Sequence, residues 1–298
     1  PYTTLFRSST FDYFKKDKLF SKNDKPAFNQ KDERFLKLKV ALPFLSSKRL
    51  ELGFGIAQIE DRYFQNNVID FDKDKYDKSG YRLFGGSVSF NGSTLNSRQF
   101  PIQGAREALV AQIFTGNESF RPGVNSENKK PVKEKHSWLQ LSYMKEKYHK
   151  MGANWILGWY LDAVYASKNF SENYTATMMQ ASEFAPTAHS KLTYNEAFRA
   201  NQYVAAGIRP IYRLNQMFHV RGEFYGFLPI FPIERNSINK AYYGKAFSRF
   251  EYLGEISVVC QLPFGAISAY VNHYSSPRRE WNVGLTLGWQ LFNYRFIE

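Results

Sequence analysis

The most constraining feature of the sequence is an alternation of apolar with polar or small residues over long segments. In residues 281–291 every odd position carries Trp, Val or Leu, and the even positions carry Asn, Gly, Thr or Gln. Residues 36–44 alternate in the same way. Successive side chains of a β-strand point to opposite faces, so each segment has one apolar face. A strand that crosses a bilayer needs about 9–11 residues, whereas soluble strands average about 5–6. The pattern therefore favours an all-β, transmembrane antiparallel β-barrel.

About twelve strands follow from this alternation. We place them near residues 11–20, 33–45, 48–64, 80–92, 105–117, 136–150, 153–168, 202–214, 216–229, 249–262, 265–274 and 281–293. Tight turns are expected at Ser46-Ser47, Met151-Gly152, Asn215 and Pro263-Phe264, and long polar loops at 21–32, 65–79, 118–135, 169–201 and 230–248. A barrel with short periplasmic turns and longer outer loops predicts this alternation of lengths. The connection 93–104 is the exception, because it is long but lies at the end of the barrel where the short turns are expected.

Composition agrees with this interpretation. Phe and Tyr account for 27 and 20 of the 298 residues, and membrane barrels carry girdles of aromatic residues. No stretch approaches the roughly 20 apolar residues of a spanning helix. The net charge of +13 lies in loops that also hold acidic residues, such as 70–78 and 127–135, and indicates solvated loops and no nucleic-acid partner. The one cysteine, Cys260, excludes an internal disulfide and is expected to face lipid.

Charged residues are predicted on the inner face of the later strands. With the apolar positions of these strands turned to lipid, the basic residues Arg209, Arg213 and Arg221 face the lumen, together with Glu223 and Glu255. Such a wall is typical of a pore, or of charges that pair with one another or with a loop folded inside. We favour pairing, and the pore stays open as an alternative.

No catalytic constellation is apparent. The stretch Gly85-Gly86-Ser87-Val88-Ser89 lacks the glycine that a nucleophile elbow needs two residues after its serine. Neither a GxxxxGK[ST] loop nor an HExxH motif occurs. The five histidines are scattered, and none has metal-ligand spacing with another. The sequence predicts no catalytic residue, no cofactor and no metal ligand in this chain.

Three segments resemble the BamA/TamA-like barrel superfamily. Residues 198–214 are similar to its sixth outer loop and following strand, although Phe198-Arg199-Ala200 keeps only the arginine of the V-R-G tip. Residues 262–267 resemble its S-P-x-G-P-L turn, and 281–292 resembles the terminal strand that the assembly machinery reads.

This resemblance implies roles for particular residues. It places Arg199 in the lumen, paired with acidic residues of the wall, for which the inner face offers Glu223 or Glu255. It also implies an assembly signal in the terminal strand, which we assign to Gly284, Leu287, Trp289 and Leu291.

A narrower resemblance is to the C-terminal barrel of Bacteroidetes patatin-like proteins, which is of the type V, subclass d kind. It rests on residues 94–101, 136–138, 195–203 and 271–274, and it spans residues 33–298. It implies that the chain supplies about the last twelve strands of a sixteen-stranded barrel. The patatin domain of that family, which holds its catalytic Ser and Asp, would precede the chain, so those roles match no residue here.

These resemblances set the expected organisation and function. Residues 1–32 would form a first strand and an outer loop, and residues 33–298 the barrel. The chain starts at Pro1 without a signal peptide, so we expect a missing N-terminal part. The barrel would anchor a patatin-like lipolytic domain in the bacterial outer membrane, with a role in its export left open. A BamA/TamA-like assembly or translocation barrel is the alternative.

The expected partners follow from a membrane barrel. They are outer-membrane lipids and, during biogenesis, the assembly machinery for outer-membrane proteins. Association with a second copy or with other outer-membrane proteins is left open by the sequence.

Overall fold

A computed structural model describes residues 2–13, 28–64, 76–124, 126–191, 193–263, 265–276, 281–288 and 296–297, with side chains from residue 30 onward. The twelve strands of the main sheet are β1 (Tyr2–Tyr13), β2 (Phe28–Leu45), β3 (Lys48–Tyr63), β4 (Asp77–Ser93), β5 (Gly104–Arg121), β6 (Val132–Lys150), β7 (Trp155–Ala166), β10 (Gln202–Arg213), β11 (Phe218–Pro229), β14 (Glu251–Leu262), β15 (Gly265–Tyr274) and β16 (Trp281–Gly288). Shorter elements lie in the connections: α1 (Tyr174–Gln180), β8 (Ser182–Glu183), β9 (Arg199–Ala200), β12 (Ile233–Arg235) and β13 (Ala241–Tyr243). Within the described ranges, no helix has the length and apolarity needed to cross a bilayer.

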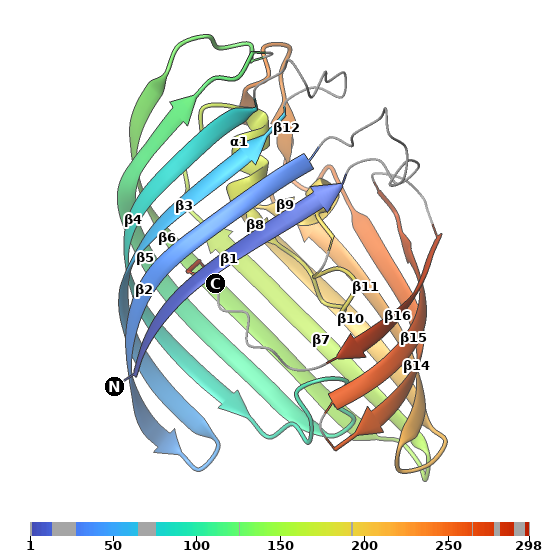
Figure 1. The fold of residues 1–298 in the computed structure, drawn as a ribbon. Helices are drawn as coiled ribbons and strands as arrows, with labels where there is room; N and C mark the ends of the chain where they lie inside the picture. The colour runs from blue at the N-terminus through green and yellow to red at the C-terminus, as the bar shows by residue number, and fades with distance from the viewer. Residues whose placement is uncertain are drawn as a thin grey trace.

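The main sheet is a meander in which every strand pairs antiparallel with the next strand of the sheet. It curls around a lumen, with the tight turns at one end and the long connections at the other (Figure 1). We call these the turn end and the loop end. The predicted all-β antiparallel barrel is confirmed. Across the described residues, β1 and β16 are the two edges of this order, and they are not paired with each other.

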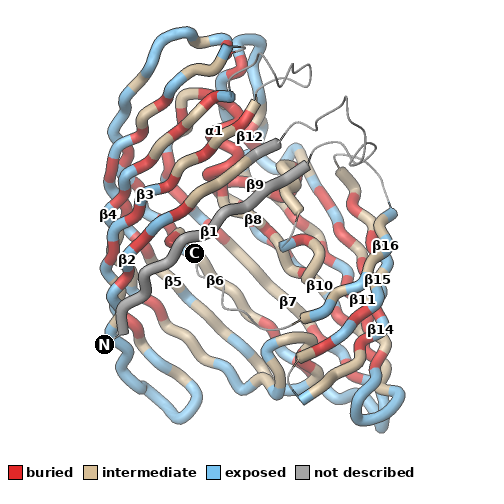
Figure 2. The backbone as a smooth tube through the Cα atoms, viewed as in Figure 1, coloured by how far each residue is buried: buried red, intermediate tan, exposed pale blue. Residues whose placement is uncertain are grey.

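The two faces of the wall have opposite character. On β3, the outward side chains Leu52, Phe54 and Ile56 are 47%, 62% and 45% exposed, whereas the inward Glu51 and Asp61 are buried. Buried and exposed positions alternate in the same way along much of the wall whose side chains are described (Figure 2). An apolar exterior around an interior that holds the buried charged residues, beside aromatic clusters such as Phe35, Phe114 and Phe296, is unlike a soluble domain and suits strands that face lipid.

Several strands run beyond the predicted limits at the loop end. β4 begins at Asp77 and β5 ends at Arg121, and β6 begins at Val132 inside the predicted loop 118–135. Hydrogen bonding between strands does not require apolar side chains, so the ladder continues past the apolar belt. The first strand, predicted at 11–20, is found at Tyr2–Tyr13, and residues 14–20 lie outside the described residues.

Among the strands whose side chains are described, β16 has the most exposed outward residues. Its outward residues Trp281, Val283, Leu285 and Leu287 are 72–80% exposed. In the interior strand β5, the outward Leu109 and Ile113 are 50% and 63% exposed. The difference follows from position, because an edge strand has a neighbour on one side only.

An arginine on the outer face should destabilise the barrel according to its depth. Ile113 lies near the middle of β5, so Ile113→Arg is expected to lower the free energy of unfolding by about 2–4 kcal/mol in a bilayer. Phe44 is 67% exposed next to the turn after β2, and Phe44→Arg should cost at most about 1 kcal/mol. Urea unfolding of the barrel in lipid vesicles would measure both. If the two substitutions lower the free energy of unfolding equally, the middle of β5 does not lie in the core of the bilayer.

Candidate functional site

The lumen is the candidate functional site, and its turn-end half holds a buried network around Arg209 of β10. The guanidinium pairs with Glu146 of β6 and donates to the hydroxyls of Tyr148 (2.5 Å) and Tyr225 (2.6 Å). It also lies 4.7 Å from the ring centre of Tyr160. The side chain of Arg209 is only 6% exposed, so these contacts replace its hydration.

Arg221 of β11 extends this network. It pairs with Glu223 two residues along the strand and donates to the Tyr148 hydroxyl at 2.9 Å. The hydroxyl of Tyr225 donates to Glu223 at 2.6 Å. The two tyrosines therefore connect the Arg209–Glu146 pair to the Arg221–Glu223 pair. A continuous network of this kind satisfies buried charges that would be costly alone.

Two glycines make room for these tyrosines. A Cβ on Gly207 would lie 2.2 Å from the ring of Tyr225, and one on Gly158 would lie 2.6 Å from the ring of Tyr148. Each ring thus lies flat against the backbone of a neighbouring strand. Gly207 belongs to the segment that resembles the superfamily, and this contact is the physical need for a glycine there.

The other residues predicted on the inner face are less central. Glu255 of β14 is buried and accepts a hydrogen bond from Asn272 of β15 at 3.3 Å. Arg213 is the last residue of β10, on the same face as Arg209, and it is partly exposed at the turn end.

The connection between β7 and β10 fills the loop-end half of the lumen. We call residues 167–201 the inner loop. Every residue of its helix α1 is buried, and the helix lies within the curl of the sheet (Figure 1). On one side Asn173 donates to the Tyr63 hydroxyl at 2.7 Å, and Gln180 donates to Asp61 at 2.5 Å.

The opposite side of the inner loop reaches the last strands. His189 bonds the Tyr274 hydroxyl at 2.8 Å, and Asn195 donates to the carbonyl of Ser276 at 2.9 Å. The inner loop is therefore tied to β3 and to β15, and it spans the lumen between them.

Arg199 lies in this inner loop, but its predicted partner was wrong. Its guanidinium pairs with Glu183 at 3.0 Å, not with Glu223 or Glu255. Arg199 and Glu183 face each other in the two-residue pairing of β9 with β8. The guanidinium also contacts the carbonyls of Met178, Met179 and Ala181 at 3.3–3.5 Å. Arg199 thus closes the C-terminal end of α1, where helix carbonyls lack partners.

The turn end is filled by the connection that the sequence marked as unusually long. We call residues 94–103 the turn plug. The carbonyl of Pro101 accepts from Arg221 at 2.8 Å, and Ser97 accepts from Gln261 of β14 at 3.3 Å. Leu95 and Ile102 pack against a buried cluster of residues from β6, β7 and β10. The extra length of this connection is therefore used to cross the lumen.

Lys168 is a buried amine of the inner loop. Its Nζ lies 4.5 Å from the ring centre of Trp138 and donates to Gln180 at 3.4–3.5 Å. Burial, aided by Lys31, lowers the pKa of Lys168 from 10.5 to about 7, against the opposing pull of Glu118 and Asp61.

This pKa predicts a pH dependence of stability. Between about pH 7 and about pH 10 the unfolded chain carries the Lys168 proton and the folded chain does not, so the free energy of unfolding rises with pH. Lys168→Met should remove that rise. Urea unfolding of both proteins at several pH values would test this, because the difference between the two curves cancels all other titrating groups. If the free energies of unfolding of the two proteins change with pH in parallel, Lys168 is not neutral in the folded protein.

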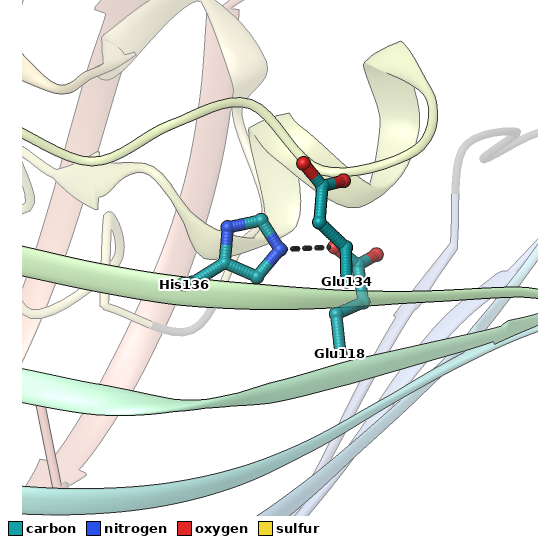
Figure 3. Close-up of side chains that lie close together, drawn as sticks. All are labelled: Glu118, Glu134 and His136. Carbon is teal, nitrogen blue, oxygen red and sulfur yellow. Dashed lines mark hydrogen bonds and ion pairs between the residues drawn. The ribbon is translucent and has the colours of Figure 1, made fainter.

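A group that the sequence did not predict lies at the loop end of β5 and β6. Glu118, Glu134 and His136 place one ligand atom each within 4.8 Å of one another (Figure 3). The Nε2 atom of His136 is 2.8 Å from Glu118. The spacing of the histidines along the chain relates them only to one another. It gives no sign of carboxylates that lie beside His136 on the same strand or on a neighbouring strand.

The proposed assembly signal is described in part. On β16, Leu287 faces outward and is 80% exposed, and Gly284 lies on the inner face, where a Cβ would lie 2.4 Å from the Tyr270 hydroxyl. Trp289 and Leu291 lie outside the described residues.

Comparisons with known proteins agree on the fold. No protein-family model matches the chain, and no curated protein matches it. Among solved structures it is similar to BamA from Haemophilus ducreyi lacking POTRA domains 1–3, with a TM-score of 0.56 and 11% identity over 95% of this chain. It also resembles the transport unit of the autotransporter AIDA-I from Escherichia coli, with a TM-score of 0.41 and 12% identity over 86% of this chain and 81% of that chain.

The fold and the wall together define the class of protein. The chain has the fold of a bacterial outer-membrane β-barrel, with an apolar outer face and a filled polar lumen, and this places it in the outer membrane. It spans 56% of the BamA chain that it matches.

Proposed function

We propose that this chain is the membrane-anchoring barrel of a larger outer-membrane protein, and that the barrel is closed to solutes. The observation that carries the proposal is the filled lumen. The inner loop is tied to both sides of the wall at the loop end, and the turn plug contacts Arg221 at the turn end. An anchor needs a stable wall with its buried charges paired, and it does not need a channel.

We further propose that the anchored domain is patatin-like and lipolytic. This rests on the resemblance of the barrel to that of patatin-like proteins. Its motifs contribute residues that make separate contacts inside the lumen: Pro101 with Arg221, Ser97 with Gln261, Trp138 with Lys168, and Arg199 with Glu183. The exposed edge of β16 favours further strands, as a sixteen-stranded barrel requires.

The native polypeptide tests this proposal. Its mass should exceed that of the 298-residue chain by a patatin-sized domain containing a G-x-S-x-G elbow. Outer membranes that contain the full protein should hydrolyse phospholipid, and alanine in place of the elbow serine should abolish that activity while leaving the barrel in the membrane. A native chain without such a domain would refute the anchored lipase.

A second candidate is a barrel for assembly or translocation of other proteins, favoured by the similarity to the BamA fold at a TM-score of 0.56. Depletion of the protein separates the two. Under the anchoring proposal, other outer-membrane proteins keep their levels and only lipolytic activity falls. A general loss of outer-membrane proteins would support the second candidate instead.

A further inference from the structure

Two glutamates face each other directly where β5 and β6 continue past the apolar belt. Glu118 and Glu134 are partners in the strand register, and His136 lies two residues along β6 on the same face. Like charges directly opposite on adjacent strands destabilise a sheet. Among the described residues, neither carboxylate has a Lys or Arg nitrogen within 4.0 Å. Within that distance and among the described residues, His136 is the basic side chain that faces the pair, and Lys168 interacts with Glu118 from farther away.

The inner part of this group is preorganised. Glu118 and His136 are each 2% exposed, and Glu118 also accepts from the Tyr81 hydroxyl at 3.2 Å and from the backbone N–H of Glu172 at 3.5 Å. The Nδ1 atom of the buried His136 has no hydrogen-bond partner among the described residues. Its Nε2 atom faces the Glu118 carboxylate at 2.8 Å, so a cation bound at Nε2 would replace that hydrogen bond and displace the Nε2 proton.

We propose that Glu118, Glu134 and His136 bind a divalent transition-metal cation, with Zn²⁺ as the best fit. Their ligand atoms lie within 4.8 Å of one another, and Figure 3 shows His136 paired with Glu118 while the Glu134 carboxylate lies beside them. Zinc accepts imidazole nitrogen and carboxylate oxygen at about 2.0–2.2 Å, and three such protein ligands leave one position for water. Calcium and magnesium favour sets of oxygen ligands alone, so the histidine selects against them.

Binding requires the contact between His136 and Glu118 to widen slightly and the Glu134 side chain to turn toward the ion. Tetrahedral ligands around zinc are about 3.3 Å apart, and the 2.8 Å from His136 Nε2 to Glu118 is already near that value. Glu134 is exposed at the rim, so it is free to change rotamer and to admit the ion from the loop end. Because Glu118 also contacts the inner loop through Glu172, the ion would tie that loop to the wall.

Titration of metal-stripped barrel with Zn²⁺ would test the site. Calorimetry on the folded protein in detergent, treated first with a chelator, is expected to show one bound equivalent. Glu134→Gln should weaken that binding by at least about tenfold, and this exposed substitution leaves the buried residues in place. Glu127→Gln, at an exposed loop position between the same strands, is the matched control and should bind like the unchanged protein.

Two further measurements complete the test. His136→Gln should also lose the bound equivalent, and gel mobility would verify that this variant is folded. Calcium in place of zinc should give no saturable binding. Absence of saturable zinc binding, equal binding by Glu134→Gln, or equal weakening by Glu127→Gln would each overturn the site.

Discussion

Replacing Arg221 with methionine is expected to lower the free energy of unfolding by about 3–5 kcal/mol. The side chain is 2% exposed and contacts Glu223, the Tyr148 hydroxyl and the carbonyl of Pro101. Methionine keeps much of the volume, but it leaves the buried carboxylate of Glu223 without its nearest counter-charge. Urea unfolding in detergent micelles, followed by tryptophan fluorescence, would measure the loss.

A half-exposed ion pair provides the control. Arg49 pairs with Glu51 at 2.5 Å, and the arginine side chain is 61% exposed at the turn end although Glu51 is buried. Lys39 lies 3.5 Å from Glu51 as a second partner, so Arg49→Met leaves that carboxylate paired and should cost much less than Arg221→Met.

A double variant separates the unpaired charge from the lost contacts. Adding Glu223→Gln to Arg221→Met removes the stranded charge and should recover at least about 1 kcal/mol. If the single variant costs no more than Arg49→Met, the network is not a main source of stability. If the second substitution recovers nothing, the loss comes from packing and from the Pro101 contact.

The inward and outward faces of the wall could be predicted from the sequence, because side chains alternate between the two faces of a strand. Once Ile208 or Val258 is assigned to lipid, every second residue is assigned as well, and a shift of one residue would invert the whole strand. The burial of Arg209, Arg221, Glu223 and Glu255 follows from that rule. The turns could be predicted too, since the alternation of apolar and polar residues is interrupted there.

The partner of Arg199 could not be predicted in this way. It depends on a two-residue pairing of β8 with β9, which brings residues 183 and 199 together inside a loop. No periodic pattern accompanies so short a pairing. An inner loop held by single contacts, such as Gln180 to Asp61, gives the sequence no repeating signal.

The Glu118, Glu134 and His136 group was missed for a related reason. The apolar alternation of β5 stops near residue 117, so residues 118–135 were predicted to be a loop. The strands continue with polar side chains, and only their register puts Glu118 opposite Glu134. Register between strands is a tertiary property, and the spacing of residues along one chain does not contain it.

Removing the inner loop and the turn plug, the two long segments that fill the lumen, is expected to convert the closed barrel into a pore. The unchanged protein should show little conductance in planar bilayers, because the inner loop and the turn plug lie one behind the other across the lumen. Replacing residues 170–198 and 95–102 with short Gly-Ser linkers should raise single-channel conductance at least about tenfold, since large barrels without a filling leave an aqueous channel.

The single deletions decide whether both barriers are needed. Two barriers in series each limit the current, so either deletion alone should give much less conductance than the double deletion. If removal of residues 170–198 alone reaches the value of the double deletion, the turn plug is no barrier, and its contact with Arg221 serves stability alone. If the double deletion stays silent while its gel mobility shows a folded barrel, the lumen is narrowed by the wall or by Phe296, which packs against Phe35 and Phe114. The closed state would then not depend on the two segments removed.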